Sequence, residues 1–263
     1  MAQRILRPLS YGDLFDEVFD LYKKHFVLFV GIAGVVVIPL YALTYAIGGW
    51  VSSIAFILAS LLSYVVIAAT TWAVSRCYLG QEATIADAYK ATRGRIIPFI
   101  ITMIVVGLII GAGFLLLVVP GIIFSFWYAF ISEVYMLEGK TGTDARNRSK
   151  QLAASQWGRI FVIGLLSSLL IWIVSAALTY PIQIIIASTG GNSTSIGGLM
   201  GFLFGIVTGI SSALTTPIQV IASVLLYYDI RVRKEGFDIE MLTASMSGSI
   251  EPIPAVSDEV KQI

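Results

Sequence analysis

One acidic residue stands inside a stretch of sequence that otherwise carries no charge. Glu133 lies in the apolar segment Ile122 to Leu137, roughly one and a half helical turns before its end. Ionisable residues inside membrane-spanning helices are costly to bury, and by default they mark binding sites or transport pathways. The favoured structural alternative is a glutamate near the membrane surface that is hydrogen-bonded to Arg146, Arg148 or Lys150.

Two further acids lie beside basic residues. Glu138 and Arg148 bracket a short polar loop and are placed to form an ion pair that closes it, which is a structural role in most proteins. Asp229 lies in "LLYYDIRVRKEG", where Arg231 or Arg233 can neutralise it locally. Tyrosines before such an acid and cations after it are typical of a helix that leaves the membrane on the cytoplasmic side. Asp229 is therefore predicted to belong to a topological stop.

Two glutamines follow prolines in similar surroundings. Gln183 lies in "TYPIQIIIAS" and Gln219 lies in "TTPIQVIAS", both within long apolar stretches. A proline kink frees backbone carbonyls, and an amide side chain nearby either lines a polar path or ties helices together. Helix packing is the favoured role. The two motifs are expected at different depths, so they do not imply a shared binding site.

The sequence lacks the usual combinations of catalytic residues. Its single histidine, His25, and single cysteine, Cys77, exclude most metal constellations, histidine-based triads and an internal disulfide. The sequence contains no phosphate-binding glycine loop, no HExxH and no GxSxG motif. We therefore expect no enzyme activity, no catalytic residue, no cofactor and no metal site. His25 and Cys77 are expected only to mark the ends of hydrophobic runs.

Composition indicates a membrane protein. Of the 263 residues, 57% are hydrophobic and 13% are charged, and the mean hydropathy is +0.87. Soluble domains carry about a quarter charged residues, so this chain lacks the polar surface that a water-soluble fold needs. An all-α integral membrane protein with membrane lipid as a partner is expected. Nucleic acid is not expected as a partner, because membrane topology already explains the basic loops.

Three blocks of the sequence carry no charge: 26–75, 96–132 and 160–228. A membrane span needs roughly 20 apolar residues, and turn-forming residues divide the blocks at "IGGWVSS", "VVPG" and "STGGNSTSIGG". The predicted domain 26–240 therefore contains six spans, at about 26–47, 51–78, 96–119, 121–138, 160–188 and 198–228. The "VVPG" segment is either a tight hairpin turn or a re-entrant break, so the fourth span either crosses fully or is re-entrant.

Basic residues indicate the orientation, because they stay on the cytoplasmic side of a membrane. With both termini inside, all 17 Lys and Arg residues fall in the N-terminal segment, the loops 76–95 and 140–159, and the C-terminal segment. The three outer turns then carry no charge. Both termini are therefore expected to be cytoplasmic. The small and polar tail 241–263 is expected to be disordered.

A hydroxyl residue followed three positions later by aspartate precedes each pair of spans. These signals are "SYGD" from Ser10, "TIAD" from Thr84 and "TGTD" from Thr141. Such pairs satisfy free amides at a helix start, and the acid suits the positive end of the helix dipole. The predicted architecture is three hairpins, each preceded by a short cytoplasmic interfacial helix. The first of these helices, within 1–25, has an acidic polar face, which favours docking on basic loops or a protein partner over anionic lipid.

Small residues recur every four positions in the sixth span, at Gly197, Gly201, Gly205, Gly209 and Ala213. A stripe of small residues lets two helix backbones approach closely. Packing within the chain is the favoured explanation, and a homo-oligomer stays open as the alternative.

Three stretches together carry a resemblance: Leu6 to Phe26, Leu115 to Leu152, and Leu225 to Leu242. They resemble the glycerophosphoryl diester phosphodiesterase membrane domain family, including its stand-alone bacterial relatives of unknown function. The resemblance implies a six-span module of the bacterial cytoplasmic membrane. It does not imply phosphodiesterase activity, because the catalytic domain of that family uses several histidines and acidic metal ligands. Glu133 stands where the family has proline or an apolar residue, so the resemblance assigns no role to it.

The leading functional hypothesis is a non-enzymatic accessory or scaffold module that organises a protein partner or lipid at the cytoplasmic face. It rests on the placement of almost all distinctive polar sequence on that face. The alternative is a transporter of lipid or a small amphiphilic solute, which the threefold repeat, the kinked spans and Glu133 favour.

Overall fold

The computed structural model describes residues 8–188 and 198–236, and every regular element in these ranges is a helix. The all-helical prediction is confirmed. Six helical stretches are long and apolar enough to cross a membrane: Phe26–Ile47, Val51–Tyr78, Ile96–Leu116, Val118–Leu137, Trp157–Ser188 and Gly198–Glu235. The expected turn "STGGNSTSIGG" with Gly197, and the expected disordered tail 241–263, lie outside the described residues.

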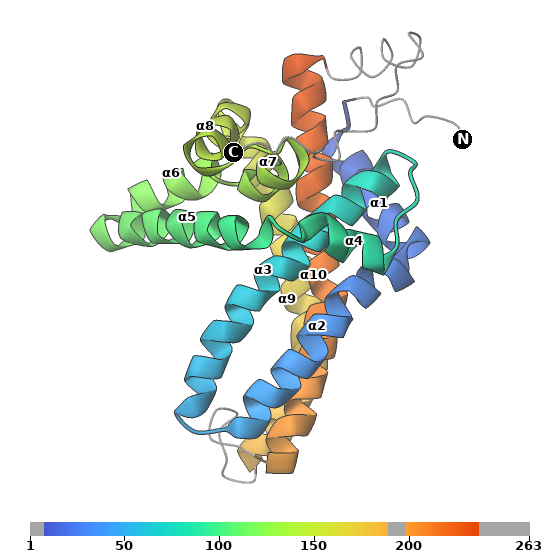
Figure 1. Ribbon diagram of the computed structural model, residues 1–263, viewed down its shortest axis with the longest axis vertical. Helices are drawn as coiled ribbons and strands as arrows, with labels where there is room; N and C mark the ends of the chain where they lie inside the picture. Colours follow the sequence, from blue (N-terminus) through green and yellow to red (C-terminus); the bar gives the residue numbers. More distant parts are fainter. Residues whose placement is uncertain (1–7, 189–197, 237–263) are drawn as a thin grey trace.

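Four long helices follow the long axis of the molecule (Figure 1): α2 (Phe26–Ile47), α3 (Val51–Tyr78), α9 (Trp157–Ser188) and α10 (Gly198–Glu235). The centre of this bundle is α10, which contacts α1, α2, α3, α7, α8 and α9. Its 38 residues span about 57 Å at 1.5 Å per residue. The hydrocarbon core of a bilayer is about 30 Å thick, so α10 is long enough to continue well beyond it.

Glycines bring α10 directly against α2. A Cβ atom at Gly205 would lie 2.5 Å from the carbonyl oxygen of Tyr41, and one at Gly209 would lie 2.7 Å from Cα of Ile38. Gly201 is buried on the same side of α10. The stripe of small residues therefore packs within this chain, because a side chain at these positions would collide with the backbone of α2.

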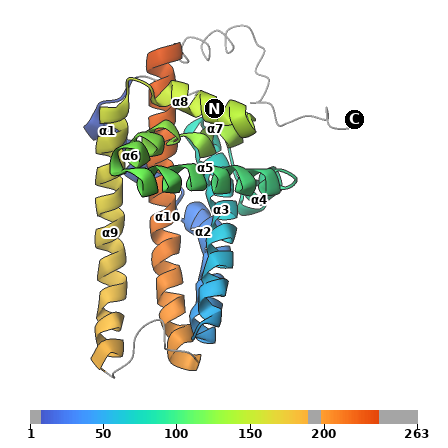
Figure 2. The ribbon, with the colours of Figure 1, turned by 90° about the vertical axis from the view of Figure 1, so that its left-hand side faces the viewer.

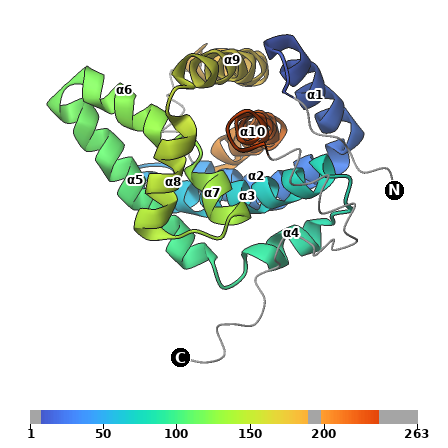
Figure 3. The same cartoon turned by 90° about the horizontal axis from the view of Figure 1, so that it is seen from above.

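Three short helices lie around one end of the long bundle, here called the α8 end (Figures 1 and 3): α1 (Tyr11–Lys24), α4 (Ile85–Thr92) and α8 (Gly142–Ala153). The apolar face of α1 is buried through Leu14, Val18 and Leu21, and it contacts α10 and α2. His25 separates α1 from α2, and Cys77 lies in the last turn of α3. Both residues thus stand at helix ends, as expected.

The three start signals each begin a helix, but they do not cap it equally. Ser10 accepts a hydrogen bond from the N–H of Asp13 at 3.1 Å, and the Asp13 carboxylate accepts one from the N–H of Ser10 at 3.2 Å. Thr84 accepts a hydrogen bond from the N–H of Asp87 at 3.2 Å. Thr141 occupies the cap position of α8, but its side chain makes no cap hydrogen bond. The predicted cap bond is therefore wrong for the third signal.

Two helices leave the bundle sideways. Helices α5 (Ile96–Leu116) and α6 (Val118–Trp127) pack against each other and run crosswise to the four long helices, as Figures 1 and 2 show. We call this pair the α5–α6 arm. Seen along the bundle axis, it extends away from α10 (Figure 3). Many of its apolar side chains are exposed: Leu108 (67%), Leu115 (90%), Leu117 (68%) and Val119 (65%).

The turn of the arm is tight. Leu117 alone separates the two helices, with extended backbone angles of φ −161° and ψ 149°. A Cβ atom at Gly113 would lie 3.0 Å from Cα of Gly121, so the two helices touch through glycine. The "VVPG" segment begins α6 and comes directly after the turn. Helix α5 ends at Leu116, three residues before the expected end of the third span.

The expected fourth span, 121–138, is divided between two helices. Helix α6 ends at Trp127, and α7 (Ile131–Leu137) begins after a short turn. Helix α7 packs against α3, α8 and α10, so it belongs to the bundle, whereas α6 belongs to the arm. The break lets the chain return from the arm to the bundle and places Glu133 in the first turn of α7.

Candidate functional site

Glu133 is enclosed by the bundle. Its residue surface is 2% exposed, and the hydroxyl of Ser223 in α10 donates a hydrogen bond of 2.5 Å to its Oε1. Its other oxygen, Oε2, has no hydrogen-bond partner among the described residues. The predicted bond to Arg146, Arg148 or Lys150 is wrong. The reason is that α7 turns Glu133 toward α10, while Arg148 contacts acids in the loop after α7 and at the end of α10.

A cavity of about 320 Å³ opens beside this carboxylate. Its walls come from four helices, α3, α7, α9 and α10, and from the turn between α6 and α7. The apolar part of the wall comes from Ile67, Ala129, Ile171 and Val220, and the polar part comes from Thr71, Ser132, Glu133, Thr215, Thr216, Gln219 and Ser223. A polar cavity among apolar helices is a typical setting for a ligand site, since each polar group there costs free energy unless it is used.

Helix α10 supplies the longest polar wall. Thr215, Gln219 and Ser223 recur every four residues, so they share one side of the helix. Gln219 is exposed while it lines the cavity, so the cavity reaches the outer surface of the bundle. Across from this wall, the Oγ1 atom of Thr71 is buried and has no hydrogen-bond partner among the described residues.

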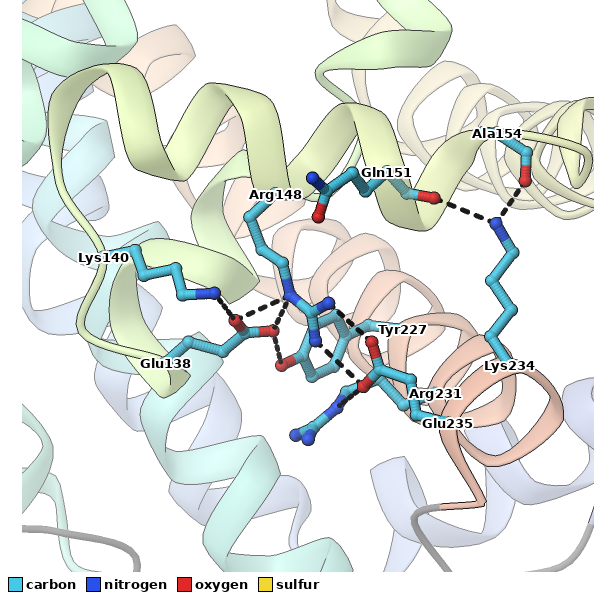
Figure 4. A network of polar contacts seen from close by, with 9 residues as sticks. All are labelled: Glu138, Lys140, Arg148, Gln151, Ala154, Tyr227, Arg231, Lys234 and Glu235. Atoms are coloured by element: carbon cyan, nitrogen blue, oxygen red, sulfur yellow. Dashed lines mark hydrogen bonds and ion pairs between the residues drawn. The ribbon is translucent and has the colours of Figure 1, made fainter.

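Glu138 lies in a second polar group, at the α8 end (Figure 4). It accepts hydrogen bonds from Arg148 Nε at 2.8 Å and from the hydroxyl of Tyr227 at 3.0 Å, and Lys140 lies 3.1 Å away. The expected pair of Glu138 and Arg148 is therefore present. Burial opposes ionisation of Glu138, but the hydrogen bonds from Arg148 and Lys140 outweigh it and hold the pKa of Glu138 below its ordinary value.

Further contacts in Figure 4 tie α8 to the end of α10. Arg148 forms a second ion pair with Glu235 at 2.5 Å, and Arg231 pairs with the same Glu235 at 3.0 Å. Lys234 donates hydrogen bonds to the backbone carbonyls of Gln151, at 2.9 Å, and of Ala154. Burial lowers the pKa of Arg148, but the hydrogen bonds from it to Glu235 and Glu138 outweigh that effect and raise the pKa above its ordinary value.

Asp229 holds three segments of the chain together. It accepts a hydrogen bond of 2.7 Å from the N–H of Leu9, and it forms ion pairs with Arg159 at 2.7 Å and with Arg233 at 3.0 Å. Of the two cations expected nearby, Arg233 is the partner, while Arg231 pairs with Glu235. The Asp229 side chain is fully buried, so its two arginines balance a charge that water does not reach.

The tyrosines before Asp229 are buried within the protein. Tyr228 lies 2.6 Å from the hydroxyl of Ser75 in α3, and Tyr227 donates its hydrogen bond to Glu138. Both residues are 2% exposed or less. Both side chains therefore point into the protein and form hydrogen bonds there, and their rings do not lie on the outer surface of the bundle.

The site residues predicted from the sequence therefore do not form one site but lie in different parts of the structure. Glu133 and Gln219 line the cavity, Glu138 and Arg148 join α8 to α10, and Gln183 is not among the residues that line the cavity. Sequence reasoning missed Thr71, Ser132, Thr215, Thr216 and Ser223. Within 8–188 and 198–236, no three His, Cys, Asp or Glu residues are grouped to hold a metal ion.

The acids at the α8 end and the acid of the cavity differ in one chemical respect. Glu138 and Asp229 each contact two cations, whereas the one side chain that forms a hydrogen bond with Glu133, among the described residues, is the hydroxyl of Ser223. The ion pairs of the first two therefore join parts of the fold, whereas Oε2 of Glu133 has no hydrogen-bond partner in the ranges 8–188 and 198–236. No family model, curated protein or solved structure matches this chain.

Proposed function

We propose that this chain is a non-enzymatic, multi-pass membrane module that organises lipid at the cytoplasmic face of the membrane. The observation that carries this proposal is the crosswise direction of the α5–α6 arm. With α2, α3, α9 and α10 across the bilayer, the arm extends along the membrane plane. It would then lie at the level of the lipids of one leaflet.

The apolar surface of the arm supports a position among lipid chains. The sequence from Ile96 to Ser132 contains no charged residue. A helix that lies at the water boundary has one polar face, which α5 and α6 lack. Exposed side chains such as Leu108 and Leu115 are apolar, so moving them from water into lipid hydrocarbon lowers the free energy of the protein.

The basic residues support the cytoplasmic leaflet. Arg95 stands directly before the arm, and Arg146, Arg148 and Lys150 follow the return of the chain into α8. Positive residues favour the cytoplasmic side, so both ends of the arm belong there. The proposal also includes both termini in the cytoplasm and a bacterial inner membrane. It differs from the six-span module that the resemblance implies, because four helices cross the bilayer and the arm lies along it.

An arm of this kind would act on lipid through its volume. Two packed helices in one leaflet displace lipid there and leave the other leaflet unchanged, so the lipids under and beside the arm must rearrange. Amphipathic and shallow insertions are sensitive to lipid composition and curvature for this reason. The contacts of α5 with α3, and of α6 with α8 and α9, hold the base of the arm in place on the bundle.

Lipid recovery tests this function. We expect the full chain, purified in mild detergent, to retain phospholipid at fixed stoichiometry by native mass spectrometry. Leu108→Asn in the arm should reduce the retained lipid, while Ile57→Asn in α3 should not, although the two parent side chains are similarly exposed at 67% and 61%. An empty wild-type protein would contradict the proposal. A stoichiometric protein in place of lipid would indicate a scaffold for that partner instead.

The cavity favours a second candidate function, a transporter of lipid or of a small amphiphilic solute. Intramembrane acids often belong to such pathways, and Gln219 connects the cavity to the bundle surface. Flux into reconstituted vesicles that falls in Glu133→Gln or Gln219→Leu would support it. Absence of flux across a broad panel of lipids and metabolites would contradict it.

A further inference from the structure

The charge of Glu133 has no counterpart in its surroundings. Among the described residues, two acids are buried, Glu133 and Asp229. Asp229 contacts Arg159 and Arg233, whereas the residues that line the cavity beside Glu133 include no lysine, arginine or histidine. A buried carboxylate is costly unless a cation or several hydrogen-bond donors accompany it. A cation inside the cavity would supply that partner.

Two hydroxyl groups on the α10 side of the cavity have used their donors, whereas the Thr71 hydroxyl across from them has no hydrogen-bond partner among the described residues. Ser223 donates to Glu133, and Thr215 donates to the backbone carbonyl of Ser211 at 2.8 Å. Each hydroxyl has a single hydrogen to donate, so these two oxygens present only lone pairs to a ligand. Oε2 of Glu133 is an acceptor as well when the carboxylate is ionised. The part of the wall around Glu133 and Ser223 therefore complements a group that donates hydrogen bonds and carries positive charge.

We infer that the cavity binds a primary ammonium group, carried either by a small free amine or by a lipid headgroup. An ammonium group has three N–H donors and no acceptor, which matches Oε2 of Glu133 and the lone pairs of Ser223 beside it. A hard metal ion fits less well, since calcium takes six to eight oxygen ligands and this cavity offers one carboxylate. Its 320 Å³ lies within the range of small-molecule sites, about 300 to 1,000 Å³.

The opening at Gln219 gives both kinds of amine a route to Glu133. Gln219 is exposed on the side of α10, so a lipid headgroup could enter from the bilayer and a free amine could enter with water. This inference goes beyond the proposed function, because it requires neither the α5–α6 arm nor transport. The chain can therefore bind an amine without organising lipid, or organise lipid without binding an amine, and the two experiments distinguish these outcomes.

Thermal stability reports the binding directly, because a ligand that binds the folded state raises the unfolding temperature. We would place the full chain in phosphatidylglycerol nanodiscs and titrate ethanolamine, with choline as the control. Choline carries the same positive charge but no N–H donor. Stabilisation by ethanolamine with little effect of choline is expected. For the lipid source, nanodiscs of phosphatidylethanolamine should stabilise the chain more than nanodiscs of phosphatidylcholine.

Three variants locate the site. Glu133→Gln removes the charge and should weaken ethanolamine binding at least about tenfold, the usual effect of losing one charge-assisted hydrogen bond. Gln219→Leu removes a polar group at the opening and should also weaken binding. Gln183→Leu changes the matching glutamine of α9, which does not line the cavity, and should bind as the wild type does. The unfolding temperature without ligand shows whether each variant folds.

Three results would overturn the inference. The first is equal stabilisation by choline and ethanolamine together with equal behaviour of the two lipids, which would show that N–H donors do not matter. The second is unchanged ethanolamine binding in a folded Glu133→Gln or Gln219→Leu variant. Stabilisation by sodium ions alone, lost in Glu133→Gln, would also overturn it in favour of a metal ion.

Discussion

Ser223 in α10 donates a hydrogen bond of 2.5 Å to Oε1 of Glu133 in α7, so the two helices meet across the wall of a polar cavity. The contact explains how an acid is held inside a bundle of apolar helices without a cation. It leaves Oε2 of Glu133 without a partner among the described residues. The contact therefore joins the two helices and leaves one carboxylate oxygen available for the ammonium group that we infer.

Ser223→Ala should destabilise the protein by about 1 to 3 kcal/mol, because it leaves a buried acceptor without its donor. Thermal unfolding in detergent, without added amine, measures the effect. Ser63→Ala is the matched control, since the Ser63 hydroxyl bonds only to the carbonyl of Ala59 in its own helix. Equal stability of the two variants would show that the bond to Glu133 contributes nothing.

Gly205→Ala should lower the unfolding temperature, because its Cβ would lie 2.5 Å from the carbonyl oxygen of Tyr41 and force α2 away from α10. Overpacking of this kind costs about 1 to 3 kcal/mol. Gly107→Ala in α5 meets no atom within 4 Å and gains helix propensity, so it should leave stability unchanged or raise it slightly. If both variants unfold at the wild-type temperature, the close approach of α10 and α2 is contradicted.

Asp229→Ala should be among the most destabilising single changes, since it leaves Arg159 and Arg233 without their shared acid. Breaking a buried ion pair by removal of one partner costs about 3 to 5 kcal/mol. Loss of the acceptor for the Leu9 N–H should also expose the start of α1 to protease. The measurements are thermal unfolding and limited proteolysis, with the exposed Asp16→Ala as control. Wild-type protease resistance would contradict the role of Asp229 at the N-terminal segment.

Glu138 should make stability depend on acid pH. Its pKa in the folded protein is below the ordinary value, so the ionised form contributes stability above the unfolded pKa of about 4.3. That contribution is lost as the pH falls through the lower, folded pKa. Thermal unfolding measured from neutral pH to pH about 3 should show a steeper loss for the wild type than for Glu138→Gln. Parallel curves would contradict the role of the carboxylate.

Helix ends were predictable from the sequence because they depend on nearby residues. The starts of α1, α4 and α8 follow local hydroxyl and aspartate signals, and α2 and α3 follow from charge-free runs of sufficient length. The direction of the α5–α6 arm was not predictable, because a charge-free run of membrane length has the same composition whether it crosses a bilayer or lies along it. The contact of Leu9 with Asp229 was equally hidden, since 220 residues separate them.

Only some of the residues that line the cavity could be predicted from the sequence. Glu133 and Gln219 stood out because a charge and an amide are rare in apolar helices. The wall residues Thr215 and Ser223 share the side of Gln219 at a spacing of four, a signal present in the sequence that was assigned to helix packing. The sequence could not assign Thr71 to the cavity. Hydroxyl residues in a membrane helix usually bond to their own backbone. In addition, the residues that line the cavity with Thr71 come from helices far away in the sequence.

The position of Leu117, at the tip of the α5–α6 arm, tests the proposed function most directly. In a Cys77→Ala background, Leu117→Cys would be treated with a membrane-impermeant maleimide in right-side-out and inside-out vesicles. Ser53→Cys, in the predicted outer turn, and Glu82→Cys, in the predicted cytoplasmic loop, are the controls, and both parent residues are exposed. An arm in the cytoplasmic leaflet predicts no labelling of Leu117→Cys from the outside. Labelling from the outside as fast as Ser53→Cys would contradict the account.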